Sequence, residues 1–228
     1  MPKRTRATKL TDVRAEKAWL KKTKPSGYVL ETRDKQKTYL IVCEGQTEEQ
    51  YFKAFPVVTA SVKPVPLGCT KTNLVECTKH ICSNEAYDEV WCVFDMDFNP
   101  DIRGQFNDFN EAISAAHLAG FKCAYSNDAF ELWFALHYNF YDQQHDRFFY
   151  YEKLSQFWQM NYEKSGKELA FSRTIYARLN NDVAADQTMA LKWAEKLWDE
   201  QQHKSFHEQN PITLVYRLVN ELNKHLRK

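Results

Sequence analysis

The sequence predicts an α/β fold with a mostly parallel sheet flanked by helices, followed by a helical C-terminal section. Two observations predict it. Apolar runs of strand type alternate with segments of helical periodicity over residues 38–140, an order typical of parallel strands joined by crossover helices. Beyond residue 141 only helical patterns continue. We therefore expect three parts: a basic N-terminal arm at 1–37, an α/β core at 38–140 and a helical section at 141–228.

Four segments of the core have the composition of strands. The first begins polar and ends in the apolar run Tyr-Leu-Ile-Val, and the second is broken by prolines, which favours a loop and a short edge strand. The third and fourth are again apolar. The four segments are residues 35–42, 57–68, 89–94 and 121–125.

Four helices are expected between and after these strands. Gly45 permits a tight turn into the first helix, and Gly120 ends an amphipathic helix at 106–119. A very apolar helix follows at 130–136. Short polar side chains cap helix N-termini by accepting a hydrogen bond from a free N–H group. The expected caps are Thr47, Asn73 and either Asn127 or Asp128.

The last part of the chain has no further strand signal. Four segments have helical periodicity: 149–162, 169–180, 184–203 and 211–225. Asn210 and Pro211 give the last of them a cap and a proline at its first position, which is a specific start signal. We therefore expect this section to be entirely helical.

The charge of the chain is unevenly distributed. The 228 residues carry a net charge of +1, but residues 1–37 hold 12 Lys or Arg against 4 Asp or Glu, and the remainder holds 19 against 26. A basic arm suggests contact with a polyanion. An equally good reading is a solvated terminus that binds nothing specific. The sequence leaves the two open.

Cysteine spacing and hydropathy exclude several classes of protein. None of the six cysteines forms a CxxC pair, and Cys77, His80 and Cys82 are too crowded within one expected helix for a zinc site. Reduced structural thiols are expected. No apolar run approaches the roughly 20 residues of a membrane span, and the basic N-terminus lacks the apolar region of a secretory signal. We expect a soluble cytoplasmic protein without a membrane partner.

Acidic side chains follow two of the expected strands. Glu44 comes directly after the first, and Asp95 and Asp97 come after the third. Carboxylates at the carboxyl ends of adjacent parallel strands meet at one edge of a sheet, and two residues on an extended strand end point to the same side. Oxygen ligands of this kind suit Mg²⁺. The alternative is that Asp95 and Asp97 are solvated turn residues.

Two further glutamates extend the candidate site. Glu131 is the only charge between 129 and 136, where a carboxylate without a partner would be costly. It either ligates the metal or pairs with a cation such as Arg173. Glu48 lies one helical turn after Glu44 and faces the same site, or it complements the helix dipole. A phosphoryl-transfer site also needs a cation to offset the negative charge of the transition state. The candidates in this chain are Lys71, Arg103, Arg173 and Arg178.

Four motifs in a fixed order resemble a known family. They are CEGQTEEQYF at 43–52, DMDF at 95–98, SNDAFELW at 126–133 and NPITLVYRLV at 210–219. Together they resemble the RloB-like family of TOPRIM-domain proteins, which is related to the overcoming-lysogenization-defect (OLD) nucleases. The match runs from about residue 37 to the C-terminus. The pair Asp128-Ala129 departs from the Asn/Pro-type residues expected there, which should alter a turn and leave the metal site intact.

The resemblance implies a TOPRIM-like Rossmannoid fold and a Mg²⁺- or Mn²⁺-dependent endonuclease that acts on DNA or RNA, tRNA included. Carried over to this chain, Glu44 is a metal ligand or general acid/base, and Asp95 and Asp97 are metal ligands. Such proteins act as effectors of bacterial anti-phage or abortive-infection systems beside an ABC- or AAA-type ATPase. A different class fits too: a catalytically silent TOPRIM-like module that docks on an ATPase. The sequence leaves homo-oligomerisation open.

Overall fold

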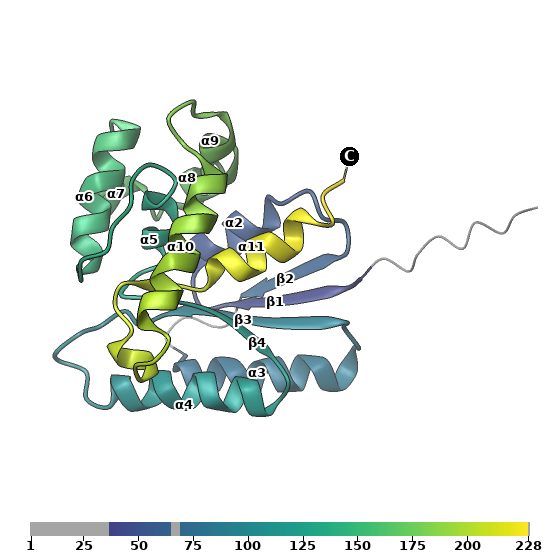
Figure 1. The fold of residues 1–228 in the computed structure, drawn as a ribbon. Helices are drawn as coiled ribbons and strands as arrows, with labels where there is room; N and C mark the ends of the chain where they lie inside the picture. Colours follow the sequence, from purple (N-terminus) through teal and green to yellow (C-terminus); the bar gives the residue numbers. More distant parts are fainter. Residues whose placement is uncertain (1–36, 65–68, 228) are drawn as a thin grey trace, which may run out of the picture. The chain divides into compact units, whose positions relative to one another are not determined.

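The computed structural model describes residues 37–64 and 69–227 (Figure 1). The chain divides into two units at residue 37, and the described residues all belong to the second unit, which begins there. The expected basic arm lies outside the described residues except for Lys37. The remainder of this section concerns the second unit.

Within the described ranges, the second unit is built on one sheet of five strands. Its order is β2-β1-β3-β4-β5; the first four strands run parallel, and β5 pairs antiparallel with β4. The mostly parallel sheet that the sequence predicts is therefore confirmed. The strands are β1 (Tyr39–Cys43), β2 (Ala60–Pro64), β3 (Glu89–Asp95), β4 (Lys122–Asn127) and β5 (Ile212–Thr213).

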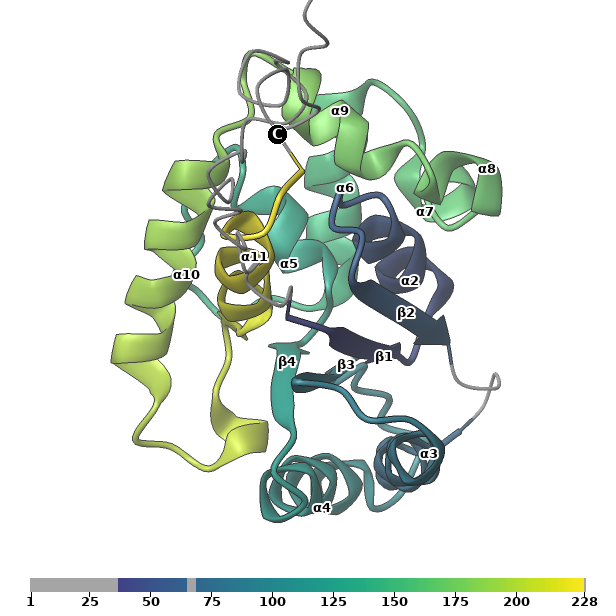
Figure 2. The same ribbon diagram turned by 90° about the vertical axis from the view of Figure 1, so that its right-hand side faces the viewer.

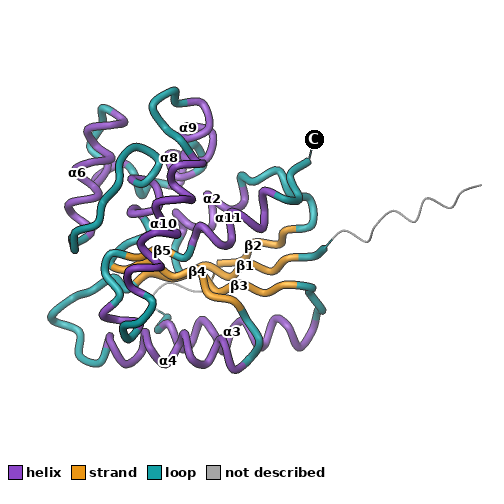
Figure 3. The backbone as a smooth tube through the Cα atoms, in the orientation of Figure 1, coloured by secondary structure: helices purple, strands orange, loops and turns teal. Residues whose placement is uncertain are grey.

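Helices cover both faces of the sheet. Figure 3 shows α3 (Lys71–Asn84) and α4 (Gln105–Leu118) together on one side, with α2 (Gln46–Lys53) and α11 (Val215–Asn223) on the other. Every residue of β1 is fully buried between these layers. A parallel strand that is covered on both faces reads as a continuous apolar run, and this is why the sequence identifies the central strands.

Most of the helical section packs on the side of α2 and α11, while Phe206–Glu208 contacts α4 on the other side. Helix α5 (Glu131–Ala135) leads into it; α6 and α8 contact α5 and α2 respectively, and α10 runs alongside α11 (Figure 2). Its elements are α6 (Arg147–Trp158), α7 (Tyr162–Ser165), α8 (Leu169–Ser172), α9 (Ile175–Asn181), α10 (Gln187–Gln201) and the 3-10 helix η2 (Phe206–Glu208).

The expectation of no strand after residue 141 is wrong. Ile212 and Thr213 form β5 beside the end of β4, and the hydroxyls of Thr213 and Ser126 hydrogen bond at 2.8 Å. Two residues are too few to show a strand period in sequence. Pro211 also does not open a helix as expected. It precedes β5, and α11 begins only at Val215.

The expected cap of the second helix is misplaced by three residues. Thr70 caps α3 by accepting a hydrogen bond from the N–H of Asn73, which lies inside the helix. The carboxylate of Asp108 on α4 accepts the N–H groups of Lys71 and Thr72, at 2.9 and 3.1 Å. This contact from another helix satisfies the first free N–H groups of α3, so the helix starts earlier than its own sequence indicates.

The other expected caps are also wrong. Helix α2 begins at Gln46, so Thr47 lies within its first turn. Asn127 and Asp128 precede α5 but cap other groups: the carboxylate of Asp128 accepts the N–H groups of Phe98 and Arg147, at 2.8 and 3.2 Å. Long-range hydrogen bonds thus take the side chains that local rules assign to helix starts.

The structure also bears on the expectations about the cysteines and about membrane spans. All six cysteines lie within the described residues, and each is a free thiol; Cys43, Cys92 and Cys123 are buried as expected of core residues. No helix in the described ranges is both long and apolar enough to span a bilayer.

One carboxylate ties α11 to the start of β1. Glu221 accepts hydrogen bonds from the Tyr39 hydroxyl at 3.1 Å, from Lys37 Nζ at 3.0 Å and from Lys224 Nζ at 2.7 Å. Burial alone would raise the pKa of Glu221, but these donors lower it to about 2. The Tyr39 side chain is fully buried, so its hydroxyl depends on this acceptor.

Replacing Glu221→Ala should therefore lower the free energy of unfolding by about 1–3 kcal/mol, because the buried Tyr39 hydroxyl loses its partner. Urea denaturation at neutral pH measures this. Lys224→Ala is the matched control: its side chain is 65% exposed, and we expect a change of about 0.5 kcal/mol or less. Equal losses in the two variants would contradict the assigned role of Glu221.

Candidate functional site

A cleft of about 200 Å³ opens at the carboxyl edge of the sheet. It lies where β1 and β3 end and α2 and α5 begin. All five carboxylates that the sequence singled out line it, although their roles stay predictions. The lining residues are Glu44, Gly45, Gln46, Thr47, Glu48, Asp95, Asp97, Glu131 and Lys167.

Glu44 follows β1 directly and is held by both its backbone and its side chain. Its N–H donates to the Val93 carbonyl at 3.0 Å, and its Oε1 accepts a hydrogen bond from Lys71 Nζ at 3.2 Å. Its other oxygen, Oε2, is buried and has no hydrogen-bond partner among the described residues. Burial and the nearby Asp95 raise the pKa of Glu44 to about 7, against the opposing effect of Lys71.

Glu48 lies in the first turn of α2 and bends back over Gly45. A Cβ atom at Gly45 would come within 2.3 Å of Glu48 Oε2, so glycine is needed here for the close approach of the carboxylate. Burial and Asp95 raise the pKa of Glu48 to about 8. The site reading of Glu48 thus has structural support, because this carboxylate lines the cleft and interacts electrostatically with Asp95 and Glu131.

Asp95 ends β3 and stands between the other carboxylates. Its Oδ2 accepts the N–H of Phe130 at 3.3 Å, which joins β3 to the start of α5. Its charge contributes to the raised pKa values of Glu44, Glu48 and Glu131. The negative charge of Asp95 therefore acts on each of the three glutamates that line the cleft.

Glu131 is almost fully buried and has two partners. It accepts a hydrogen bond from the Tyr162 hydroxyl at 3.0 Å, and Lys167 Nζ lies 3.6 Å from its Oε1. Burial raises the pKa of Glu131 despite Lys167. The cation beside Glu131 is thus Lys167 and not Arg173, the example that the sequence offered: Lys167 follows α7, which packs beside α6 next to α5.

Asp97 is placed differently from Asp95. Strand β3 ends at Asp95, and Asp97 has a φ of 51°, so the expected extended backbone through both aspartates is wrong. The Asp97 carboxylate is half exposed, forms an ion pair with Arg147, and still lines the cleft. A left-handed backbone at a non-glycine residue is strained and marks functional turns in many proteins.

Three partners of the carboxylates could not be read from sequence. Lys167, Tyr162 and Arg147 come from the helical section and carry no motif or spacing that points to the cleft. Lys71 was one of four candidate cations and is the one beside Glu44; its side chain is only 9% exposed. Of the other candidates, Arg178 lies over the rings of Trp158 and Phe171.

The donor chemistry of the cleft fits a hard divalent cation, but its present arrangement is not a closed ligand set. Carboxylate oxygens are the ligands Mg²⁺ prefers, and the unpartnered Oε2 of Glu44 is a free acceptor. In the described part of the chain, no group of three or more His, Cys, Asp or Glu residues is arranged to hold a metal ion. Binding would require the carboxylates to turn toward one another, away from Lys71 and Lys167.

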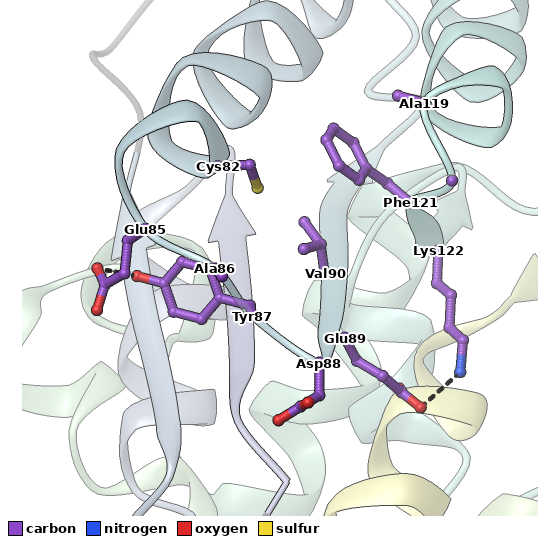
Figure 4. Close-up of a pocket in the computed structure, with 11 residues that line it drawn as sticks. Cys82, Glu85, Ala86, Tyr87, Asp88, Glu89, Val90, Ala119, Phe121 and Lys122 are labelled. Atoms are coloured by element: carbon purple, nitrogen blue, oxygen red, sulfur yellow. Dashed lines mark hydrogen bonds and ion pairs between the residues drawn. The ribbon is translucent and has the colours of Figure 1, made fainter.

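A larger cavity lies at the opposite end of the strands. It has a volume of about 330 Å³ and is lined by the first residues of β3 and β4 and by the ends of α3 and α4. Figure 4 shows Tyr87, Val90 and Phe121 around it, with the Glu89–Lys122 ion pair at one side. None of the five carboxylates lines it, so it is separate from the candidate site.

The fold and the cleft together define an α/β protein with buried carboxylates at the carboxyl edge of a mostly parallel sheet. Comparison with family models makes the assignment specific: the model described as RloB-like protein matches residues 39–222. The chain belongs to the RloB-like protein family, which confirms the resemblance seen in its motifs.

Two further comparisons add context. A search of curated proteins finds no match. Among solved structures, the chain is similar to the C-terminal region of the Burkholderia pseudomallei OLD protein, with 12% sequence identity and a TM-score of 0.36, over 83% of this chain and 98% of that one. A similarity this low carries no argument about the cleft.

The raised pKa values predict how pH acts on the stability of the metal-free protein. Glu44 and Glu48 have pKa values of about 7 and 8, above the ordinary 4.5, so the folded protein binds more protons than the unfolded chain between these limits. The contribution of these two glutamates to the free energy of unfolding should therefore fall as pH rises from about 5 to about 8, whereas buried His137, whose pKa is lowered to about 4, contributes in the opposite direction below its ordinary pKa. Urea denaturation in the presence of a chelator measures it.

Glu48→Gln removes one of the two titrations and should reduce that fall by roughly 1 kcal/mol or more. Glu76→Gln, on the exposed side of α3, is the control and should leave the slope unchanged. A Glu48→Gln variant whose stability changes with pH as steeply as that of the parent would show that Glu48 is ionised throughout this range.

Proposed function

We propose that this protein is a Mg²⁺- or Mn²⁺-dependent endonuclease that hydrolyses phosphodiester bonds in DNA or RNA, tRNA included. The observation that carries the proposal is the convergence of Glu44, Asp95, Asp97, Glu131 and Glu48 on one cleft at the carboxyl edge of the sheet. Burying so many acids together is unfavourable without a cationic ligand. Their cost is therefore better explained by a reaction than by stability.

The proposal assigns a role to each group. Asp95, Asp97, Glu44, Glu131 and Glu48 are the proposed metal ligands. When bound, the ion polarises the phosphoryl group and lowers the pKa of a bound water. As the alternative to binding the ion, Glu44 would act as general acid or base; in the metal-free cleft its pKa is raised to about 7, near neutral pH. Lys71 and Lys167 are placed to offset negative charge that develops on the phosphate.

We further propose a biological setting. The chain belongs to the RloB-like family, and its four motifs resemble proteins related to the OLD nucleases. Both points favour an effector of a bacterial anti-phage or abortive-infection system, active in the cytoplasm with an ABC- or AAA-type ATPase as partner. The partner and the trigger are part of the proposal, and so is any assembly of several copies of the chain.

The alternative is a catalytically silent TOPRIM-like module that docks on an ATPase. One observation favours it: Glu44, Glu131 and Asp97 each already face a cationic side chain, namely Lys71, Lys167 and Arg147. In a silent module these ion pairs would be permanent. In an enzyme they would yield to the metal.

Substitution of the cleft separates the two. Glu44→Gln and Asp95→Asn should each lower metal-dependent cleavage by about 100-fold or more, because they remove a ligand or the proton-transfer group. Labelled single-stranded and duplex DNA and RNA, and tRNA, are incubated with purified protein, alone and with its candidate ATPase, in Mg²⁺, Mn²⁺ or chelator. Glu76→Gln serves as the control and should cleave like the parent.

Calorimetric titration with Mn²⁺ tests binding apart from turnover. The parent should bind the ion, and Asp95→Asn should weaken that binding by about tenfold or more. A parent that binds no Mn²⁺ with the ATPase present, together with variants that protect cells from phage as well as the parent does, would establish the silent module instead.

A further inference from the structure

A second cavity adjoins the acidic cleft. It has a volume of about 270 Å³, slightly below the ~300–1,000 Å³ of pockets for drug-sized ligands, so it suits a single ring system. The two spaces meet along one turn: Asp97 lines the cleft and Phe98 lines the cavity. The N–H of Phe98 donates to Asp128 Oδ1 at 2.8 Å, which fixes this turn against the end of β4.

One wall of the cavity is aromatic and accessible. The rings of Phe98 and Phe106 are stacked, with centroids 5.1 Å apart and planes at 7°, yet these residues are 46% and 43% exposed. The His207 ring lies 4.8 Å from that of Phe106 and closes the row. Exposed apolar surface of this kind beside a candidate active site marks a binding surface.

The cavity lining also includes amide groups. Asn127 Nδ2 donates to the His207 carbonyl at 2.9 Å, while its Oδ1 accepts no hydrogen bond from the described residues. Asn210 Oδ1 is buried and likewise has no donor among residues 37–64 and 69–227. Both residues line the cavity. A buried acceptor left without a donor, as Asn210 Oδ1 is, is costly unless a ligand supplies one.

The charges around the cavity favour a neutral ligand attached to a phosphate. Asp128 and Asp146 also line it, so a phosphate inside would be repelled. Arg147 stands at the boundary, where it pairs with Asp97 and lies 3.8 Å from Asp128. A ring in the cavity and a phosphate near Arg147 would thus both be placed next to the carboxylates.

We propose that this cavity binds one unpaired nucleobase of the strand whose phosphodiester lies in the acidic cleft. Stacking on aromatic side chains and hydrogen bonds from amides to base edges are how proteins hold unstacked bases. This inference rests on the proposed nuclease function and adds a preference to it: single strands, loops or bulges are bound in place of intact duplex.

The experiment measures base binding without cleavage. Oligonucleotides of about ten nucleotides carrying one 2-aminopurine, as single-stranded RNA, single-stranded DNA and the matching duplexes, are titrated with the full chain in a chelator. Stacking in the cavity should quench the fluorescence of the single strands, and the single strands should bind more tightly than the duplexes.

Two variants at one position isolate the stacking. Phe106→Leu keeps an apolar side chain but removes the middle ring of the row formed by Phe98, Phe106 and His207, on which the base would stack, and should weaken single-strand binding about five- to fifty-fold and abolish the quench. Phe106→Tyr should restore both. Leu118→Ala is the control on the same helix; Leu118 is 90% exposed and remote from the cavity lining, so binding should match the parent. Circular dichroism checks that each variant is folded.

The outcomes separate this inference from the proposed function. Cleavage by the parent, with Phe106→Leu binding and cutting single strands as the parent does, would overturn the base pocket and leave the nuclease standing. Quenching that depends on Phe106 in a parent that cuts nothing would uphold the pocket and overturn the nuclease. A parent that binds no single strand would overturn the pocket whatever its activity.

Discussion

The cost of burying several carboxylates in one cleft is the constraint on which the surrounding structure depends. Glu48 and Glu131 are almost fully buried, and both feel the charge of Asp95. Two lysines offset this charge. Lys71 is brought to Glu44 by α3, whose first N–H groups are held by Asp108 of α4. Lys167 is brought to Glu131 by the helical section. Helices on both faces of the sheet thus supply the positive charges that offset the carboxylates at its edge.

The helical section is for this reason part of the site and not an appendage to it. It supplies Tyr162, Lys167 and Arg147 to the carboxylates, and β5 to the sheet. The turn that carries His207 and Asn210 then lies against Asn127 at the end of β4. A core ending at residue 140 would retain the acids and Lys71 but lose Tyr162, Lys167 and Arg147.

Much of this arrangement was predictable from sequence. Central parallel strands such as Tyr39–Cys43 are buried on both faces and read as apolar runs, and the strand-end rule gathered Glu44 and Asp95 at one edge. The remainder depends on contacts between distant segments. Thr70 and Asn73 are equally good caps by their chemistry, and Asp108 decides between them. Lys167 and Arg173 are equally good partners for Glu131, and only the packing of α7 beside α6 selects Lys167.

The edge strand β2 has a consequence for how copies of the chain meet in solution. A sheet this apolar would stack with its neighbours wherever a long, flat edge lay open. Strand β2 is only five residues long and contains Lys63 near its end, followed by Pro64, which has no N–H to offer an incoming strand. At the other side, β5 stops after two residues and turns into α11. Both borders of the sheet therefore resist strand-to-strand aggregation, which keeps its carboxyl edge accessible at high protein concentration.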